Sequence, residues 1–191
     1  MNIAIFASGS GSNFEAMKRA ADKGLLSGKI SLLICDKPGA LVESRAEGHG
    51  VPVVSLSPKT FSSKADYEAE LLRELKKYDI SFLVLAGYMR LVGPTLLDAF
   101  EGRIVNIHPS LLPSFKGLDA IGQALDFGVK VTGVTVHVVD AGMDTGPILA
   151  QESVTIEPGD TRDDVEKKIR EVEHRLYPKT VEQMLQHLQG V

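Results

Sequence analysis

Two short segments of the chain bring together side chains that could act on a carbonyl group. Residues 106–113 contain Asn106 and His108, and residues 140–147 contain Asp144. Because alternate residues of a strand point to the same side, the Asn106 amide and the His108 imidazole are expected to face one oxygen atom. Such groups can polarise a carbonyl, and a carboxylate beside the imidazole favours its protonated form. The pattern predicts acyl chemistry.

Each of these residues also has an ordinary structural explanation. A single histidine at a strand end more often makes a structural hydrogen bond, but its pairing with Asn106 favours a site role for His108. Asp144 alone could equally be a turn residue that bonds its own backbone. His137 lies within a β-branched run, and a sheet histidine and a site histidine are equally good interpretations of it.

Composition limits the class of protein. The chain has 191 residues, 43% of them apolar, and a formal net charge of −4, which predicts one globular domain over residues 1–191. No basic stripe marks a nucleic-acid partner, and no apolar window is long enough to span a membrane. Cys35 is the only cysteine and is expected to be a buried, inert thiol. Because no secretory leader is recognisable, we expect a cytoplasmic protein.

Hydrophobic periodicity predicts an α/β fold. Aliphatic runs alternate with amphipathic segments, which is typical of an open, mostly parallel twisted sheet with helices on both faces. The expected strands number about seven and cover roughly residues 2–7, 30–35, 52–55, 80–85, 103–108, 131–138 and 147–155.

Local signals mark the ends of two expected helices. Ser12 and Glu15 form a capping-box pattern at the start of the first helix, whose core face is expected to carry Phe14, Met17, Ala21 and Leu25. Another helix should open after residues 158–161, and Pro178 is expected to break or kink it.

Sheets of this kind bind ligands beyond the carboxyl ends of their strands, so the loops there are expected to hold the functional site. Residues 7–13 are rich in glycine and serine and precede a helix, where backbone amides can bind a phosphate. The segment lacks the lysine of a Walker loop, and Phe14 replaces the third glycine of a dinucleotide motif. Asp36, at the end of the second strand, keeps the dinucleotide alternative open, and a plain tight turn is an equally good interpretation of the loop alone.

A second loop, residues 87–94, combines glycines and Arg90 with aliphatic side chains. Backbone groups against apolar walls suit a flat heteroaromatic ligand. Taken alone, the segment is more simply an ordinary connection with Arg90 in solvent, and its place beside the other loops favours the ligand site.

Other common chemistries lack their motifs. The chain has no Gly-x-Ser-x-Gly, no paired cysteines and no His-Glu-x-x-His, which disfavours serine hydrolases, thiol redox proteins and common zinc enzymes. His108, His137 and Asp144 match no compact ligand spacing, so no metal is expected.

The motifs together resemble those of the phosphoribosylglycinamide formyltransferases, folate-dependent enzymes of purine synthesis, over essentially the whole chain. The segments that carry the resemblance are residues 8–13, 87–90, 106–113 and 140–147. It implies a formyltransferase fold with a Rossmann-like N-terminal half. It also implies transfer of the formyl group of 10-formyltetrahydrofolate to the amine of glycinamide ribonucleotide, with these two small molecules as the partners.

The same resemblance implies roles for individual residues. The catalytic group would be Asn106, His108 and Asp144. The phosphate substrate would be held by Gly11, Ser12, Asn13, Arg170 and Glu173. The folate would be bound by Lys64, Met89, Arg90, Leu91, Val92, Asn106 and Asp140.

Two departures keep alternatives open. Lys64 stands where some relatives carry arginine, and residues 114–117 resemble the branch that hydrolyses 10-formyltetrahydrofolate. Such a deformylase and a non-catalytic folate- or nucleotide-binding module therefore remain alternatives to the transferase. A monomer and a homodimer are equally compatible with the sequence.

Overall fold

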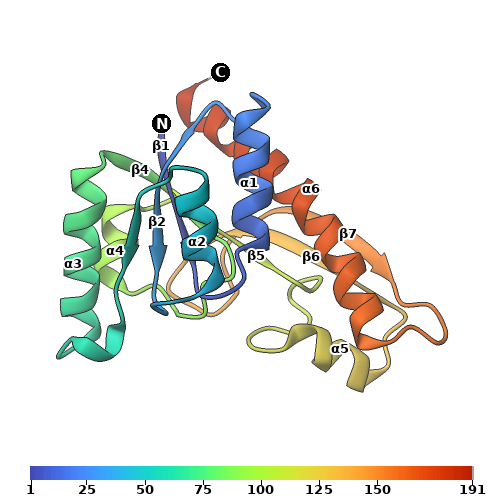
Figure 1. Cartoon of the computed structure of the whole chain (residues 1–191). Helices are drawn as coiled ribbons and strands as arrows, with labels where there is room; N and C mark the ends of the chain where they lie inside the picture. Colours follow the sequence, from blue (N-terminus) through green and yellow to red (C-terminus); the bar gives the residue numbers. More distant parts are fainter. Residues whose placement is uncertain (191) are drawn as a thin grey trace.

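The computed structural model describes residues 1–190 as a seven-stranded sheet with helices on both faces (Figure 1). The strands are β1 (Asn2–Ala7), β2 (Lys29–Cys35), β3 (Val53–Ser55), β4 (Ile80–Leu85), β5 (Ile104–His108), β6 (Val131–Val138) and β7 (Ile148–Thr155). The helices are α1 (Ser12–Asp22), α2 (Leu41–Gly48), η1 (Pro58–Thr60), α3 (Lys64–Lys77), α4 (Pro94–Ala99), α5 (Ala120–Phe127) and α6 (Arg162–Gln189). The predicted fold class is confirmed, and each strand begins and ends within about two residues of its expected position.

The strand order is β3-β2-β1-β4-β5-β6-β7. Strands β1 to β5 pair in parallel, whereas β6 and β7 are antiparallel to their neighbours. The chain runs outward from β1 to β3 and then returns to add β4 on the other side of β1. This switch in direction opens a crevice at the carboxyl ends of β1 and β4, where open α/β sheets bind their ligands.

Each face of the sheet packs against its own set of helices. Ile3 and Ile5 of β1 point to the face covered by α1, α2, α5 and α6, and Ala4 and Phe6 point to the face covered by α3 and α4 (Figure 1). This alternation follows from the two-residue repeat of a strand, and the run of apolar residues in β1 reflects its burial on both faces.

Helix α6 is hydrogen-bonded to the two strands that form the floor of the crevice. Its Tyr177 is fully buried, and the hydroxyl donates to the carbonyl oxygens of Leu85 at 2.7 Å and Val105 at 3.1 Å. These carbonyls belong to the two strands whose ends carry the predicted chemistry. A 28-residue helix therefore holds the floor of the crevice in register.

Two predictions about the first helix are wrong, and one about the last helix is wrong in part. Gly11, with a φ of 78°, occupies the N-cap of α1, so Ser12 is already helical and no capping box forms. Leu25 lies beyond the end of that helix and is exposed, so it does not extend the core face. Pro178 was expected to break or kink α6; it is buried inside the helix, which continues without a break to Gln189. The predicted capping box exists instead at the start of α6, between Thr161 and Asp164.

Candidate active site

The predicted chemistry converges on one crevice at the carboxyl ends of the central strands. The crevice has a volume of about 610 Å³. Its lining includes most of the residues singled out from the sequence: Asn13, Met89, Arg90, Leu91, Val92, Asn106, His108, Asp140, Asp144 and Glu173.

Four predicted residues lie outside this lining. Gly11 lies directly before α1, and Ser12 faces a neighbouring cavity. Arg170 is exposed on α6, close enough to Glu173 for its charge to lower the pKa of that carboxyl. Lys64 is the exposed first residue of α3. These four can act only from the margins of the crevice.

His108 and Asp144 form the centre of the site. The His108 Nε2 lies 2.8 Å from the carbonyl oxygen of Phe115, which can only accept, so Nε2 carries a proton. The other ring nitrogen, Nδ1, lies 3.4 Å from the Asp144 Oδ2. That carboxylate also accepts a hydrogen bond from the Gly117 amide at 2.9 Å. Nδ1 is thus the ring atom positioned to exchange a proton beside a carboxylate.

The amide of Asn106 is oriented by His137. Antiparallel pairing places these residues opposite each other on β5 and β6. The His137 Nδ1 lies 3.0 Å from the carbonyl oxygen of Val138 and must donate to it, and burial lowers the pKa of this ring. The imidazole is therefore neutral, and its Nε2 accepts from the Asn106 Nδ2 at 3.3 Å. One N–H of the Asn106 amide remains for a ligand oxygen.

Together these groups can stabilise negative charge on a carbonyl oxygen. Asn106 offers a neutral donor, and His108, with Asp144 behind it, can offer a charged one. The Asp144 Oδ1 lies 3.7 Å from the His137 Nε2 as well. The carboxylate therefore lies between two imidazoles, but because the His137 Nε2 carries no proton, only the His108 Nδ1 is placed to exchange one with it.

One end of the crevice is polar and joins the start of α1 to α6. The Asn13 Nδ2 donates to the Glu173 Oε2 at 3.3 Å, and the buried Oδ1 of Asn13 has no hydrogen-bond partner within residues 1–190. Burial raises the pKa of Glu173 to about 7, while Asn13 and Arg170 oppose the rise. An unpaired acceptor beside a carboxyl that titrates near neutrality suits a ligand with N–H or O–H donors.

Gly11 makes this end of the crevice possible. A Cβ at this position would lie 2.6 Å from the Val42 Cγ2, and the left-handed φ of 78° disfavours any other residue. The close approach brings the loop onto the start of α2, where the Val42 amide donates to the Gly9 carbonyl at 3.1 Å. The first amides of α1 are left to face an anion.

The other end of the crevice is an apolar strip that follows β4. The side chains of Met89 and Leu91 are 59% and 53% exposed, which is unusual for such residues in one small patch. A buried Glu68 fixes the end of the strip by accepting from the Gly93 amide at 2.5 Å, and Lys64 packs beside the same glycine. Exposed apolar side chains on a fixed backbone suit a flat ligand.

The loop after β6 closes the site around Asp144. The Asp140 Oδ1 accepts from the Gly142 amide at 3.0 Å and from the Thr145 hydroxyl at 2.6 Å. Gly146 passes so close to β6 that an added Cβ would lie 1.8 Å from the Val138 carbonyl oxygen. Asp144 itself has a φ of 54°. The loop is thus folded tightly enough to aim one carboxylate at His108.

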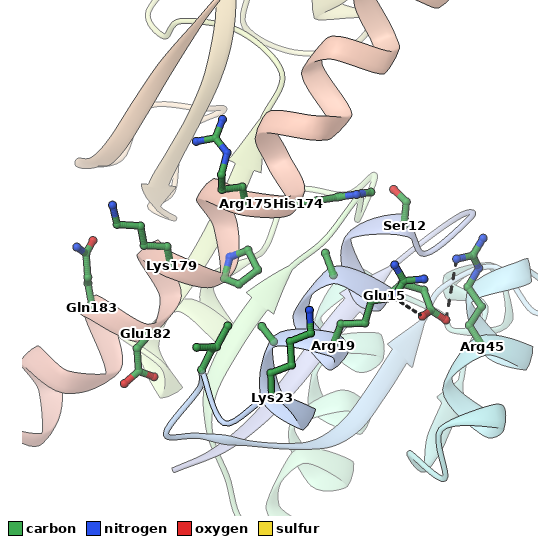
Figure 2. Close-up of a pocket in the computed structure, with 14 residues that line it drawn as sticks. Ser12, Glu15, Arg19, Lys23, Arg45, His174, Arg175, Lys179, Glu182 and Gln183 are labelled. Atoms are coloured by element: carbon green, nitrogen blue, oxygen red, sulfur yellow. Dashed lines mark ion pairs between the residues drawn. The ribbon is translucent and has the colours of Figure 1, made fainter.

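A second cavity, of about 620 Å³, lies between α1 and α6, on the outer side of the glycine-rich loop of residues 7–13 (Figure 2). Arg19 and Arg45 reach towards Glu15 there, at 3.9 and 4.0 Å. Of the predicted site residues only Ser12 lines it. It contains none of the carbonyl-polarising groups, so the chemistry belongs to the first crevice.

The described part of the chain provides no metal-binding cluster and no membrane-spanning helix. Within residues 1–190, no group of three or more histidine, cysteine, aspartate or glutamate side chains could hold a metal ion. No helix in that range combines the length and apolarity needed to cross a bilayer. The expectation of a metal-free reaction stays a prediction.

Sequence reasoning left the role of His137 undecided and missed Gly117 and Phe115. Their contributions depend on which strands pair and on how residues 108–117 fold back on His108. The alternation within β6 placed His137 on one face of a strand but not opposite Asn106. No pattern in the sequence marks the Phe115 carbonyl as the partner that fixes the His108 proton.

Comparisons with known proteins identify the family of the chain. A model of the family described as formyl transferase matches residues 1–181. The phosphoribosylglycinamide formyltransferase of Bacillus subtilis is 48% identical over 183 residues, which cover 96% of this chain and 94% of that protein. The protein of that name from Escherichia coli is 36% identical and covers 93% of this chain and 84% of its own.

Solved structures give the same result. The crystal structure of phosphoribosylglycinamide formyltransferase from Bacillus halodurans superposes with a TM-score of 0.95 at 59% identity, covering 97% of this chain and 95% of that chain. Glycinamide ribonucleotide transformylase 1 from Geobacillus kaustophilus gives a TM-score of 0.94 at 56% identity, covering 96% and 98%. The family match and these similarities show that the chain belongs to the formyl transferase family.

Proposed function

We propose that the protein transfers the formyl group of 10-formyltetrahydrofolate to the amine of glycinamide ribonucleotide, a step of purine synthesis. One observation carries the proposal: Asn106, His108 and Asp144 meet in a crevice that is polar at the α1 end and apolar at the β4 end. A phosphorylated acceptor and a flat folate donor match these two ends. The names of the similar proteins support the acceptor and the transfer of a formyl group.

In the proposed reaction the acceptor amine attacks the formyl carbon directly. A C–N bond forms to the acceptor, and the oxygen of the tetrahedral intermediate is stabilised by Asn106 and by protonated His108. The C–N10 bond then breaks. A proton lost by the attacking amine is balanced by one gained at N10, and Asp144 with the His108 Nδ1 carries it between them, directly or through water. The chemistry needs no metal and no covalent enzyme intermediate.

The acceptor would lie at the polar end of the crevice. The first amides of α1, at Gly11, Ser12 and Asn13, would bind its phosphate, as the helix dipole favours. Glu173 would accept from the donor groups of the glycinamide and ribose, and Arg170 would add positive charge beside it. This places the attacking amine between the phosphate loop and His108.

The donor would lie on the apolar strip. Met89 to Val92 would contact the pterin, and Asp140 would hold the closing loop over it. Lys64, at the margin of the strip, would meet the carboxylate end of the folate. Neither a nucleic acid nor a membrane is required, and we expect a cytoplasmic enzyme that works as a monomer or homodimer.

One assay separates this proposal from its alternatives. Purified protein receives 10-formyltetrahydrofolate with and without glycinamide ribonucleotide, and tetrahydrofolate release is followed. Release that requires the acceptor is expected. Release at the same rate without the acceptor would mean a hydrolase, and no release in either mixture would mean a binding module.

A further inference from the structure

Ser8 links the loop of residues 7–13, here called the phosphate loop, to the apolar strip of residues 89–92, here called the folate strip. Its Oγ donates to the Asp36 Oδ1 at 2.5 Å and accepts from the Met89 amide at 3.0 Å. Its own amide donates to the Gly87 carbonyl oxygen at 3.1 Å. Ser8 is only 4% exposed and does not line the crevice. One hydroxyl group therefore joins two loops that lie some 80 residues apart in the sequence and that face different substrates.

Asp36 completes this connection from the end of β2. Its side chain is 1% exposed, and its Oδ2 accepts from the Arg90 Nε at 2.8 Å. Arg90 is the one cation that forms an ion pair with Asp36 in the described part of the chain. Since a buried carboxylate without its partner is strongly destabilised, Asp36 restrains Arg90. Asp36 also lies outside the lining of the crevice.

We propose that Ser8 and Asp36 are positioning residues for the folate donor. Through Ser8 the pair fixes the backbone of Met89, and through Asp36 it fixes the side chain of Arg90. The affinity for the donor then depends on two side chains that touch neither substrate. The inference rests on the proposed function, which places the folate on residues 89–92.

The proposal makes an unusual prediction for the phosphate loop. Ser8→Ala leaves the Met89 amide and one oxygen of Asp36 without partners, and the strip is no longer held in place. We expect the KM for 10-formyltetrahydrofolate to rise about tenfold, while the KM for glycinamide ribonucleotide and kcat change less than about threefold. A residue that touched the phosphate would give the opposite pattern.

Variants of Asp36 separate its two contacts. Asp36→Asn keeps an oxygen that can accept from the Ser8 hydroxyl but removes the charge that holds Arg90, so a rise of about fivefold in donor KM is expected. Asp36→Ala removes both contacts and should match or exceed Ser8→Ala. This graded series is a response that general destabilisation would not produce.

The test combines steady-state kinetics with hydrogen exchange of the amides of residues 88–93, measured with and without tetrahydrofolate. Ser44→Ala is the matched control, since Ser44 is exposed on α2 and bonds only the Leu41 carbonyl within residues 1–190. Tetrahydrofolate should protect the strip in the wild type and in Ser44→Ala, and protect it less in Ser8→Ala.

The outcomes separate the placement of folate from the positioning role of Ser8 and Asp36. Absence of protection in the wild type would overturn the placement of folate on the strip and this inference with it. Wild-type protection that persists in Ser8→Ala, with an unchanged donor KM, would overturn the positioning role alone. Should Ser8→Ala fail to fold, Asp36→Asn, which preserves size and an acceptor, decides by the same two measurements.

Discussion

Replacing Glu173 with glutamine should remove a pH dependence from the stability of the fold. Burial raises the pKa of this carboxyl from 4.5 to about 7. Between those values the folded chain keeps a proton that the unfolded chain releases. The stability contributed by the group is thus complete below pH 4.5 and is lost as the pH rises through 7. A difference of 2.5 in pKa (7 − 4.5) corresponds to about 3 kcal/mol.

Urea unfolding of the wild type and Glu173→Gln at pH 5, 6, 7 and 8 measures this effect. Glutamine keeps the size of the side chain and an oxygen that accepts from Asn13, so the difference between the two proteins isolates the titration. The wild type should lose about 2–3 kcal/mol relative to the variant between pH 5 and 8. Glu171→Gln, at an exposed position of the same helix, is the control. Parallel stability profiles for the wild type and Glu173→Gln would refute the argument.

Three further changes test the site and its support. Asp144→Asn should lower kcat about 100-fold or more and change the KM for glycinamide ribonucleotide much less, since in the proposed reaction the carboxylate serves proton transfer; equal losses in both constants would contradict that role. Tyr177→Phe removes the hydroxyl that bonds two strand carbonyls and should lower the free energy of unfolding by about 1–3 kcal/mol in urea; unchanged stability would show that the hydroxyl is not needed. Gly146→Ala places a Cβ 1.8 Å from the Val138 oxygen and should lower kcat at least tenfold by displacing the Asp144 loop, whereas Gly48→Ala, where a Cβ meets nothing within 4 Å, should retain full activity.

The fold was predictable because the spacing of apolar residues differs clearly between the strands, which are continuous aliphatic runs, and the amphipathic helices. The failures were local and have local causes. The capping box at Ser12 was wrong because Gly11 adopts a left-handed conformation and takes the N-cap, which the spacing of Ser12 and Glu15 does not reveal. Pro178 is accommodated within α6, where the helix packs on the sheet, because tertiary packing outweighs the loss of one helical hydrogen bond.

The site was predictable only as far as single strands determine it. Alternation along β5 placed Asn106 and His108 on one side, and both line the crevice. The contact between Asn106 and His137 depends on antiparallel pairing of β5 with β6, and the contact between Asp36 and Arg90 depends on β2 and β4 flanking β1. Which strands lie side by side cannot be read from the sequence of any one strand. The contacts between these residue pairs could therefore be identified only in the folded structure.

The hydrogen bond between Asn13 and Glu173 joins residues separated by 160 positions. A growing polypeptide that has not yet released α6 from the ribosome has no Glu173 in place and no Tyr177 to secure the ends of β4 and β5. The polar end of the crevice therefore cannot form before α6 has packed on the sheet. A ligand that binds there stabilises only molecules in which α6 is in place, so glycinamide ribonucleotide, bound as proposed, should raise the population of those molecules.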